Sequence, residues 1–415
     1  MSESEKLSTD PYKGVRDFYP EDQFIQGYIK AVWRKTVESF GYQAYDASIL
    51  EPTELYKAKS GEEIVNEQTY SFKDRGERDV TLRPEMTPTV ARMVAAKRRE
   101  LKYPLRWYSI PNLFRYERPQ RGRLREHWQL NADIFGVPGI EAEIEMISVA
   151  YQIMKNFGIA DDKFEIRINS RKILDAEFAK LGLSEEKSHA LKKLLDKKHK
   201  VKNFDEEAEK ILGKKVSIEI KPDTVLNDII SKLALRGISN VVFDQDLVRG
   251  FDYYTGMVFE VYDLHPDNNR ALFGGGRYDN LLSIFDAEPV PTVGFGMGDV
   301  TMRDVLETYN LLPEYRSSTD VAVLPFEEQY FEASDKVASA LREMDINVSV
   351  DYSNKKIGDK IGKADKEKVP YVLVIGEEEA KTGTYKLKEL ATKEETTGTL
   401  EEIGHHLSCD CGCDE

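Results

Sequence analysis

Apolar and polar residues follow two different periods in the N-terminal part of the chain, and each period predicts a type of element. From Phe24 to Phe40 apolar residues recur at helical spacing, and Gly41 follows as the expected end of that helix. Residues 105–118 and 126–135 have strand character and flank a polar turn rich in Arg and Gly, so they predict a long antiparallel hairpin. Helical spacing returns in residues 141–157.

The pattern changes again further along the chain. Residues from about Phe164 to Asn240 are Lys-rich and helical and lack Gly-rich turns, which indicates an inserted module, and strand character resumes at Val241. After a linker around Leu312 to Thr319, strands such as VAVLPF and YVLVIG alternate with helices, which predicts a small α/β domain. We therefore expect an α+β protein with a first core segment 1–163, a helical insertion 164–240, a second core segment 241–312, an α/β domain 319–403 and a disordered polar tail 404–415.

The composition narrows the class of protein. The chain has 415 residues, more than the roughly 250–300 at which a single hydrophobic core stops growing, so we expect two or three domains. Its 59 basic and 74 acidic residues give a net charge of −15, which argues against a protein that coats nucleic acid with its whole surface. Any contact with RNA is therefore expected to be local.

The cell compartment and the cysteine chemistry follow from two further observations. No apolar run approaches the roughly 20 residues that span a bilayer, and the N-terminal MSESEKLSTD is too polar for a secretion signal. All three cysteines lie in the last seven residues, which excludes a disulfide framework and a catalytic thiol in the body of the protein. We expect a cytoplasmic enzyme that makes no membrane contact.

The predicted hairpin carries polar residues that are candidates for a site. Alternation places Arg115 and Glu117 on one face of the first strand. On the returning strand, one face holds His127, Gln129, Asn131 and Asp133, and the other holds Trp128, Leu130, Ala132 and Ile134. A strand with one wholly polar face inside a large sheet is either exposed to solvent or lines a pocket.

The segment that connects the two strands is strongly basic. Residues 115–125 hold five arginines and one glutamate, a local charge of +4 in an acidic protein. Because a planar guanidinium matches phosphate oxygens, this segment indicates a site for the phosphates of ATP or of RNA. A solvated charged hairpin explains the same charge equally well.

The segment TLRPEMTP offers a second group of candidates. Pro84 restricts Arg83 to extended geometry, and a period of two is then expected to place Glu85 and Thr87 on the same face. A carboxylate beside a hydroxyl suits an ammonium group. The alternative, a strand end at the surface, is equally consistent with this segment alone.

A third group lies in LVRGFDYYTG and in GGGRYD at residues 274–279. Arg249 precedes a glycine and the paired Tyr253 and Tyr254, and the glycines of the second segment supply backbone that can approach a ligand closely. Taken singly, glycine clusters mostly make turns and paired tyrosines mostly pack. Their combination favours a binding site.

These segments, taken together, resemble the histidyl-tRNA synthetases, a family of class II aminoacyl-tRNA synthetases. The matching pieces are GVRDFYP at Gly14, TLRPEMTP, FRYERPQRGR, RGFDYYTG and GGGRYD, and they occur in the family's order along almost the whole chain. RGFDYYTG is the element specific to histidine, whereas the FRYER region is common to the class. VLVIGEEE and KLKEL resemble parts of the anticodon-binding domain that several class II enzymes share.

The resemblance implies a catalytic antiparallel sheet flanked by helices, and a homodimer formed largely through the first helix and the strands that follow it. It implies an enzyme that activates histidine with ATP and Mg²⁺ to histidyl-adenylate and transfers it to tRNA(His). Adenylation fits the candidate residues, because it needs fixed positive charge at the α-phosphate more than it needs acid–base catalysis.

The resemblance also implies a role for each candidate residue. For ATP it implies Arg115 at the α-phosphate, Glu117 at the adenine end and Arg123 at the outer phosphates. For histidine it implies Glu85, Thr87 and Gln129 around the amino group, Asp133 and Tyr254 at the imidazole, Arg249 at the carboxylate and the α-phosphate, and Tyr253 and Tyr278 along the pocket.

The chain departs from the family pattern at several positions. Met86 replaces a usual glycine, and Asp133 replaces a usual glutamate. In GFGMGDVTM, Val300 and Thr301 stand where the family carries a glutamate and an ATP-binding arginine. We expect Arg303 to point away from that site, since two residues along a helix turn it by about 200°. Instead we predict that the outer phosphates are covered by Arg123, Arg121 or Arg125, with Thr301 donating at most one hydrogen bond, and that Asp299 caps the helix that follows.

Two other functions are weighed against the synthetase. A catalytically silent relative, such as the regulatory subunit of ATP phosphoribosyltransferase, would bind histidine as a signal, but such relatives usually lack the anticodon domain. An RNA-binding scaffold without chemistry would give no reason for Glu85, Gln129, Asp133 and Arg249 to occur together. Both alternatives are therefore less favoured.

Two further features concern RNA and metals. Basic surfaces for tRNA are expected at residues 115–125 and at the helix 355–368, and the lysine run 187–202 is either a further clamp or a solvated helix face. The tail carries residue types that bind zinc: His405, His406, Cys409, Cys411 and Cys413. Its Cys-x-Cys-x-Cys spacing is tighter than the usual structural zinc pattern, so a disordered tail without metal is favoured.

Overall fold

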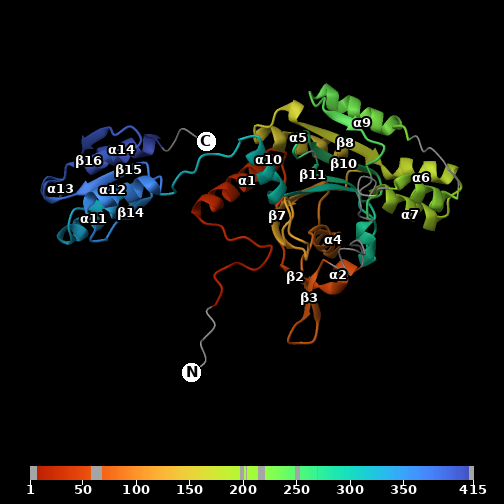
Figure 1. The fold of residues 1–415 in the computed structure, drawn as a ribbon, viewed down its shortest axis with the longest axis horizontal. Helices are drawn as coiled ribbons and strands as arrows, with labels where there is room; N and C mark the ends of the chain where they lie inside the picture. The colour runs from red at the N-terminus through yellow and green to blue at the C-terminus, as the bar shows by residue number, and fades with distance from the viewer. Residues whose placement is uncertain are drawn as a thin grey trace. The chain divides into compact units, whose positions relative to one another are not determined.

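The computed structural model describes residues 7–57, 68–196, 201, 203–213, 220–247, 253–268 and 270–410. The chain forms two compact units, Met1–Leu312 and Pro313–Glu415, and each is described by itself (Figure 1). In the described part of the chain, no helix combines the length and the apolar character needed to cross a membrane.

The first unit is built on a large sheet whose described strands follow the order β1-β5-β7-β12-β11-β10-β8-β9, with β6 paired to β7. These strands are β1 (Gln43–Ala44), β5 (Leu105–Ser109), β6 (Asn112–Phe114), β7 (Glu126–Phe135), β8 (Phe164–Ser170), β9 (Val241–Phe243), β10 (Met257–Asp263), β11 (Ala271–Arg277) and β12 (Thr292–Gly298). β1 pairs with β5, and β8 with β9, in parallel, whereas the other printed pairs are antiparallel. The predicted α+β class with an antiparallel sheet is confirmed.

Two helices cover one face of this sheet and bury its apolar side. α1 (Pro20–Ser39) and α5 (Glu141–Asn156) contact each other, and they enclose one core with Leu130, Ala132 and Ile134 of β7. The predicted helix from Phe24 is confirmed but begins already at Pro20, because proline fits the first turn, where no hydrogen bond is lost. Gly41 ends it at φ +81°.

The predicted hairpin exists but is interrupted. Ile110 and Pro111 separate β5 from β6, since Pro111 has no N–H to give to the ladder. β6 ends at Phe114, and the basic segment 115–125 is a loop whose base is closed by Arg115 N donating to Arg125 O at 2.9 Å. Arg115 and Glu117 therefore lie in a loop and not in a strand.

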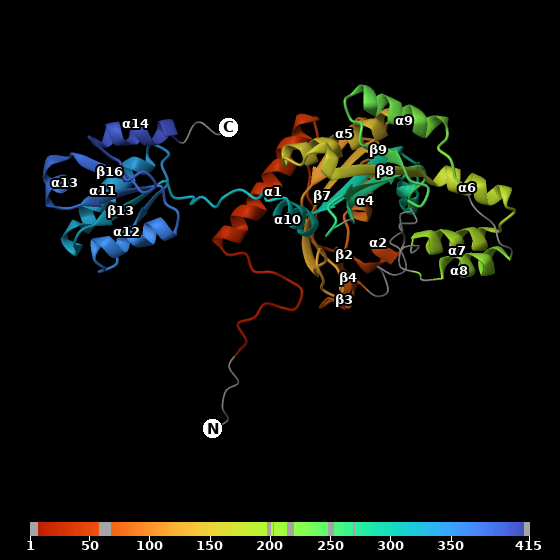
Figure 2. The ribbon, with the colours of Figure 1, turned by 45° about the horizontal axis from the view of Figure 1, so that its top comes forward.

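The expectation of a helical segment from Phe164 onward is wrong for its first part. Residues 164–170 form β8, whose alternating Phe164, Ile166 and Ile168 are buried in the core and whose backbone pairs with β10. The helices of this region are α6 (Arg171–Lys180), α7 (Glu185–Asp196), α8 (Phe204–Leu212) and α9 (Thr224–Leu235). Figure 2 shows α6, α7 and α8 gathered together, and α9 over β8 and β9.

A smaller layer carries the segment TLRPEMTP. β2 (Leu50–Pro52), β4 (Asp79–Leu82) and β3 (Tyr70–Lys73) form a three-stranded sheet, next to α2 (Thr53–Lys57) and α4 (Thr87–Ala96). The first unit also contains α10 (Asp299–Thr308) and the short 3-10 helices Asp161–Lys163 and Leu281–Phe285.

The second unit has the predicted alternation of strands and helices. Its sheet follows the order β14-β13-β15-β16-β17, with β13 (Val321–Pro325), β14 (Val348–Val350), β15 (Tyr371–Ile375), β16 (Tyr385–Glu389) and β17 (Glu395–Gly398). Its helices are α11 (Phe331–Arg342), α12 (Ile357–Lys366), α13 (Glu377–Thr382) and α14 (Leu400–Asp410), with a 3-10 turn at Glu328–Tyr330.

The start of the expected disordered tail is helical. α14 runs through residues 404–410, because Ile403 and Leu407 lie one turn apart and are both fully buried in the core of this unit. The expectation of disorder from residue 404 is thus wrong for these residues, whereas Cys411 and Cys413 lie outside the described residues.

Candidate active site

Two neighbouring cavities open along the polar face of β7. The larger has a volume of about 290 Å³ and is lined by Arg115, Glu117, Gly122, Arg123, Leu124, His127, Gln129, Glu260, Ala271, Leu272, Phe273, Gly296, Gly298, Val300 and Thr301. The smaller has a volume of about 110 Å³ and is lined by Glu85, Thr87, Arg115, Gln129, Asn131, Asp133, Tyr253, Tyr254, Gly274, Tyr278, Gly294, Phe295 and Gly296. Both cavities share Arg115, Gln129 and Gly296.

All but one of the candidate ATP and histidine residues from the sequence line these two cavities. The four candidate ATP residues Arg115, Glu117, Arg123 and Thr301 line the larger cavity. The candidate histidine residues Glu85, Thr87, Gln129, Asp133, Tyr253, Tyr254 and Tyr278 line the smaller one. Arg249, the remaining candidate, lies outside the described residues.

Arg115 is oriented by the segment that carries Glu85. Its Nε donates to the carbonyl oxygen of Pro84 at 2.8 Å, which fixes the guanidinium at the junction of the two cavities. Arg123 donates to the Glu117 carboxylate at 3.3 Å across the mouth of the larger cavity. Burial lowers the pKa of His127 to about 3, with Arg115 and Arg16 adding to the effect, so this imidazole is neutral.

The floor of the smaller cavity holds a buried acid. The carboxylate of Asp133 accepts a hydrogen bond from the Tyr278 hydroxyl. Burial raises the pKa of Asp133 to about 7, although the bond from Tyr278 opposes the shift. Tyr253 and Tyr254 stand with Tyr278 in a cluster of rings whose centroids are 4.9 to 6.2 Å apart. The cavity thus combines two buried acids, Glu85 and Asp133, with phenol groups.

Glycines of β12 make room for these side chains. In the strand register, Gly294 is opposite Asp133 and Gly296 is opposite Asn131. A Cβ atom on Gly294 would collide with the Asp133 carboxylate and the Tyr278 hydroxyl, and one on Gly296 would collide with the Gln129 amide. Only glycine leaves the cavity open at these two positions.

Glu85 and Thr87 reach the smaller cavity by a route that sequence reasoning did not predict. β4 ends at Leu82, and Thr87 is the first residue of α4. Pro84 cannot extend the ladder, and Pro88 favours the first turn of a helix. The expected period of two is therefore wrong here, although both side chains line one cavity.

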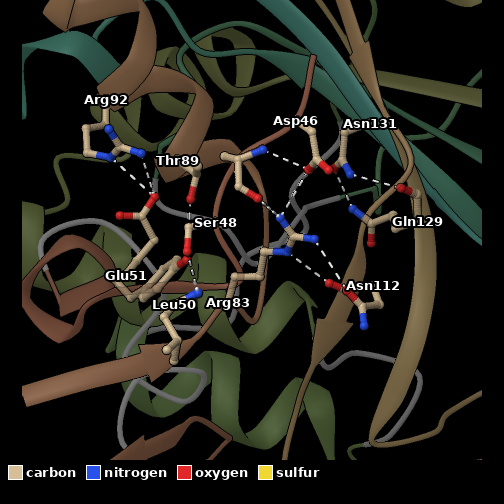
Figure 3. Close-up of polar contacts among 12 residues, drawn as sticks. Asp46, Ser48, Leu50, Glu51, Arg83, Thr89, Arg92, Asn112, Gln129 and Asn131 are labelled. Atoms are coloured by element: carbon tan, nitrogen blue, oxygen red, sulfur yellow. Dashed lines mark hydrogen bonds and ion pairs between the residues drawn. The ribbon is translucent and has the colours of Figure 1, made fainter. Parts of the chain in front are cut away.

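A buried arginine, missed from the sequence, holds this segment in place (Figure 3). Arg83 is 4% exposed, and its guanidinium donates to the carbonyl oxygens of Asn112 at 3.0 Å and of Ala47 at 2.8 Å. Its own carbonyl accepts from Phe114 N at 3.0 Å. No local signal separates this arginine from a surface residue, because its partners come from distant parts of the chain.

A second ion pair in Figure 3 anchors α4. Arg92 of α4 lies 2.8 Å from the carboxylate of Glu51, which is itself 5% exposed. Removing Arg92 would leave the buried Glu51 charge poorly solvated. This pair therefore fixes the helix at whose first residue Thr87 stands.

Thr301 lies in the first turn of α10, and its hydroxyl is bonded to the protein backbone. β12 leads directly into α10, and the Thr301 hydroxyl bonds to the carbonyls of Leu272 at 3.2 Å and Gly298 at 3.1 Å. Arg303 pairs with Asp22 and Glu307 and is not part of the cavity wall, so its predicted direction is confirmed.

The prediction that Asp299 caps α10 is wrong. Gly298 is the N-cap, and no side chain caps the helix. The Asp299 carboxylate instead accepts from Arg16 at 2.6 Å and from Trp128 N at 2.9 Å. These bonds tie the N-terminal segment and β7 to the start of α10.

The three arginines proposed for the outer phosphates lie in different environments. Arg123 lines the larger cavity. Arg121 instead pairs with Asp304 at 2.7 Å. Arg125 lies with its guanidinium 3.9 Å from the ring centre of Tyr116. Arg123 is therefore the one of the three whose side chain faces the cavity.

The histidines of the tail lie on α14, where His406 packs its ring edge-on against Tyr371. Cys409 belongs to the same helix, but its side chain, like Cys411 and Cys413, is outside what the structure describes. Among the described residues, no group of three or more His, Cys, Asp or Glu side chains is arranged to hold a metal ion.

Known proteins resemble this chain in both sequence and fold. The sequence model of the family "Histidyl-tRNA synthetase" matches residues 14–214 and 200–299, and that of the "Anticodon binding domain" matches residues 320–409. The histidine–tRNA ligase of Leptospira biflexa is 43% identical over 96% of this chain and 97% of its own, and that of Opitutus terrae is 37% identical over 94% and 96%. A solved histidyl-tRNA synthetase from Nostoc sp. has the same fold, with a TM-score of 0.78 at 22% identity over 97% of this chain and 100% of its own. The chain therefore belongs to the histidyl-tRNA synthetase family.

Proposed function

We propose that this chain activates histidine with ATP to histidyl-adenylate, releasing pyrophosphate, and then transfers the histidyl group to the 3′ end of tRNA(His). One observation carries the proposal: Arg115 lies on the wall of both cavities. With histidine in the smaller cavity and ATP in the larger, its guanidinium stands where the amino-acid carboxylate meets the α-phosphate. The relatives, all histidine–tRNA ligases, support the same reaction.

The reaction depends on position and charge more than on proton transfer. The histidine carboxylate is already a nucleophile, so the site has to hold it in line with the α-phosphorus and to stabilise the charge that builds there. Arg115 supplies fixed positive charge on the side of Pro84. Arg249 is proposed to supply the second charge, at the substrate carboxylate and the α-phosphate.

Histidine selection falls to the smaller cavity. Glu85, Thr87 and Gln129 are proposed to bind the ammonium group, and Asp133 with Tyr254 to bind the imidazole. An imidazole both donates and accepts hydrogen bonds. An apolar side chain of similar size could not donate a hydrogen bond to the buried Asp133 carboxylate, which disfavours its binding.

ATP is proposed to occupy the larger cavity, with Glu117 at the adenine end and Arg123 at the outer phosphates. The donor set also fits Mg²⁺, which commonly binds through one or two carboxylates together with substrate phosphates. Glu260 lines this cavity and is the residue proposed to hold the ion. When bound there, Mg²⁺ would neutralise the negative charge of the departing pyrophosphate.

The C-terminal unit is proposed to bind the anticodon arm, and the burial of Lys360 narrows the choice of lysines for that contact. Lys360 was predicted to face RNA, but it is 2% exposed and its Nζ donates to the carbonyls of Pro325 at 2.9 Å and Asp351 at 3.1 Å. Lys360 therefore stabilises the fold. Lys355 and Lys356 are exposed and are the proposed tRNA contacts. Much of the run 187–202 lies outside the described residues.

A homodimer and a cytoplasmic location complete the proposal. The dimer is proposed to form through α1 and the strands that follow it. Leu50 of β2 and Phe72 of β3 support a contact there, because these large apolar side chains are 41% and 49% exposed on the three-stranded sheet. Sedimentation or light scattering of the full chain tests the dimer.

Amino-acid-dependent pyrophosphate exchange tests the activity. With ATP and Mg²⁺, histidine is expected to support exchange and the other standard amino acids are not. Binding of histidine without exchange would replace the ligase with a silent histidine-binding regulator. That regulator is disfavoured by the match to an anticodon-binding domain and by the identity to ligases along nearly the whole chain.

A further inference from the structure

The larger cavity has too little positive charge for the ligand proposed for it. Its charged lining residues are two arginines, Arg115 and Arg123, and two glutamates, Glu117 and Glu260, and they sum to zero. The neutral His127 and Thr301 add nothing. A nucleoside triphosphate carries several negative charges, and a bound Mg²⁺ would offset only part of them, so a further cation close to the wall would improve the electrostatic match.

One such cation lies directly behind the cavity wall. Arg270 precedes Ala271, the first residue of β11, and its guanidinium packs against Gly122. Gly122 and Ala271 both line the cavity. Gly122 has φ +75°, and a Cβ atom there would come within 2.8 Å of the Arg270 Cζ. A glycine at this position thus lets the guanidinium approach the cavity.

The guanidinium is held in a fixed orientation. Its Nη1 donates to the Arg121 carbonyl at 3.0 Å, and its Nη2 pairs with Asp304 on α10. Asp304 also pairs with Arg121, so one carboxylate is shared by two arginines and the cluster keeps a net charge of +1. The Arg270 Nε is buried and has no acceptor. A buried donor without an acceptor is costly, so a shift of the side chain that brought this Nε to a phosphate oxygen would remove that cost.

Arg270 is better placed than Arg121 for this role. The Arg270 side chain is 28% exposed, whereas that of Arg121 is 58% exposed, so solvent screens its charge less. Asp304 lies one helical turn after Thr301, which lines the cavity. The cluster of Arg270, Arg121 and Asp304 therefore lies next to Thr301, where α10 contributes only a hydroxyl group to the cavity wall.

We propose that Arg270 binds the outer phosphates of ATP and supplies the charge that position 301 does not. This inference rests on the proposed function, because it takes ATP as the ligand of the larger cavity. Arg121 and Asp304 act as positioning residues that hold the guanidinium against Gly122.

The test compares variants in pyrophosphate exchange and in ATP binding by calorimetry. Arg270→Met keeps an unbranched apolar side chain but removes the guanidinium and its charge. We expect it to raise the KM and the Kd for ATP by about tenfold or more, with less than about a twofold change in the KM for histidine. Arg303→Met is the matched control, since Arg303 also forms exposed ion pairs on α10 but does not line the cavity. It is expected to change neither constant.

A rescue variant separates phosphate binding from a structural role. Adding Thr301→Arg to Arg270→Met places a guanidinium on the same cavity wall, and it is expected to recover much of the lost ATP affinity. An unchanged Kd for ATP in Arg270→Met overturns the inference, and so does a loss that Thr301→Arg does not recover. If the wild-type chain binds ATP but shows no histidine-dependent exchange, the proposed function fails while the calorimetric comparison still decides the role of Arg270.

Discussion

Replacing Asp133 with asparagine separates two effects of one buried carboxyl group. The wild-type carboxyl is 4% exposed, and burial raises its pKa from 3.8 to about 7. Asparagine has nearly the same shape and can still accept the bond from Tyr278, but it carries no charge at any pH. Histidine binding and protein stability are therefore expected to respond in opposite directions.

The stability effect has a sign that follows from linkage. Between the unfolded pKa of 3.8 and the folded pKa of about 7, the folded protein holds a proton that the unfolded chain has lost. Wild-type stability from this group is fully present below the lower value and is lost as the pH rises through about 7. Between about pH 5.5 and about pH 8.5 the loss is about 2 kcal/mol, since each pKa unit corresponds to about 1.4 kcal/mol.

The Asp133→Asn variant is expected to keep this part of its stability as the pH rises, because asparagine does not titrate. Urea denaturation at both pH values measures it: relative to wild type, the variant should gain about 2 kcal/mol of unfolding free energy at the higher pH. Its KM for histidine should rise by about tenfold or more, because a charge-assisted acceptor is lost, while the KM for ATP changes little. Parallel stability curves for the two proteins, or equal losses for both substrates, would refute the reasoning.

A control variant tests the cause of the shift. In Tyr278→Phe the hydrogen bond that lowers the pKa of Asp133 is absent, so the carboxyl should titrate at a higher pH. The wild-type KM for histidine is expected to rise as the pH falls through about 7, and the midpoint should move upward in this variant. Asp133→Asn supplies the baseline, because free histidine itself titrates in this range.

Three further predictions address the rest of the site and the RNA surface. Arg249→Ala is expected to abolish histidine-dependent exchange without changing the circular dichroism spectrum or the dimer, because the charge is needed most in the transition state; near-normal exchange would contradict its role. Thr301→Ala should lower kcat/KM for ATP by less than about tenfold, since the Thr301 hydroxyl already bonds to backbone carbonyls. Arg123→Ala should lower it far more. Similar losses in the two variants would show that both side chains contribute equally to ATP use. Replacing Lys355 and Lys356 together with alanine should raise the KM for tRNA and flatten its salt dependence, and an unchanged slope would exclude this surface.

The polar face of β7 was predictable because it depends on a local property. In a strand every second side chain points the same way, so His127, Gln129, Asn131 and Asp133 had to share a face whatever the rest of the fold did. The resemblance to the family then assigned two of them, Gln129 and Asp133, to the histidine site. The cavities bring those residues together as expected.

The errors arose where distant contacts decide the outcome. β8 was taken as helix because the Lys-rich helices that follow it dominate the composition. Its partner strand β10 lies far along the chain, with paired residues 87 to 99 positions apart. Lys360 reads as a surface lysine on an amphipathic helix, and only the carbonyls of Pro325 and Asp351 bury it. Arg83 was missed for the same reason, since its partners belong to other loops.

The two β12 glycines opposite Asp133 and Asn131 also limit how amino-acid specificity can change. At Gly294 and Gly296 the space for substrate exists because a side chain is absent, and any substitution there fills it. This wall can neither be enlarged nor be given new chemical groups. A variant that selects a different amino acid must therefore be built from the opposite side, where Glu85, Thr87 and Tyr254 present side chains that can be exchanged.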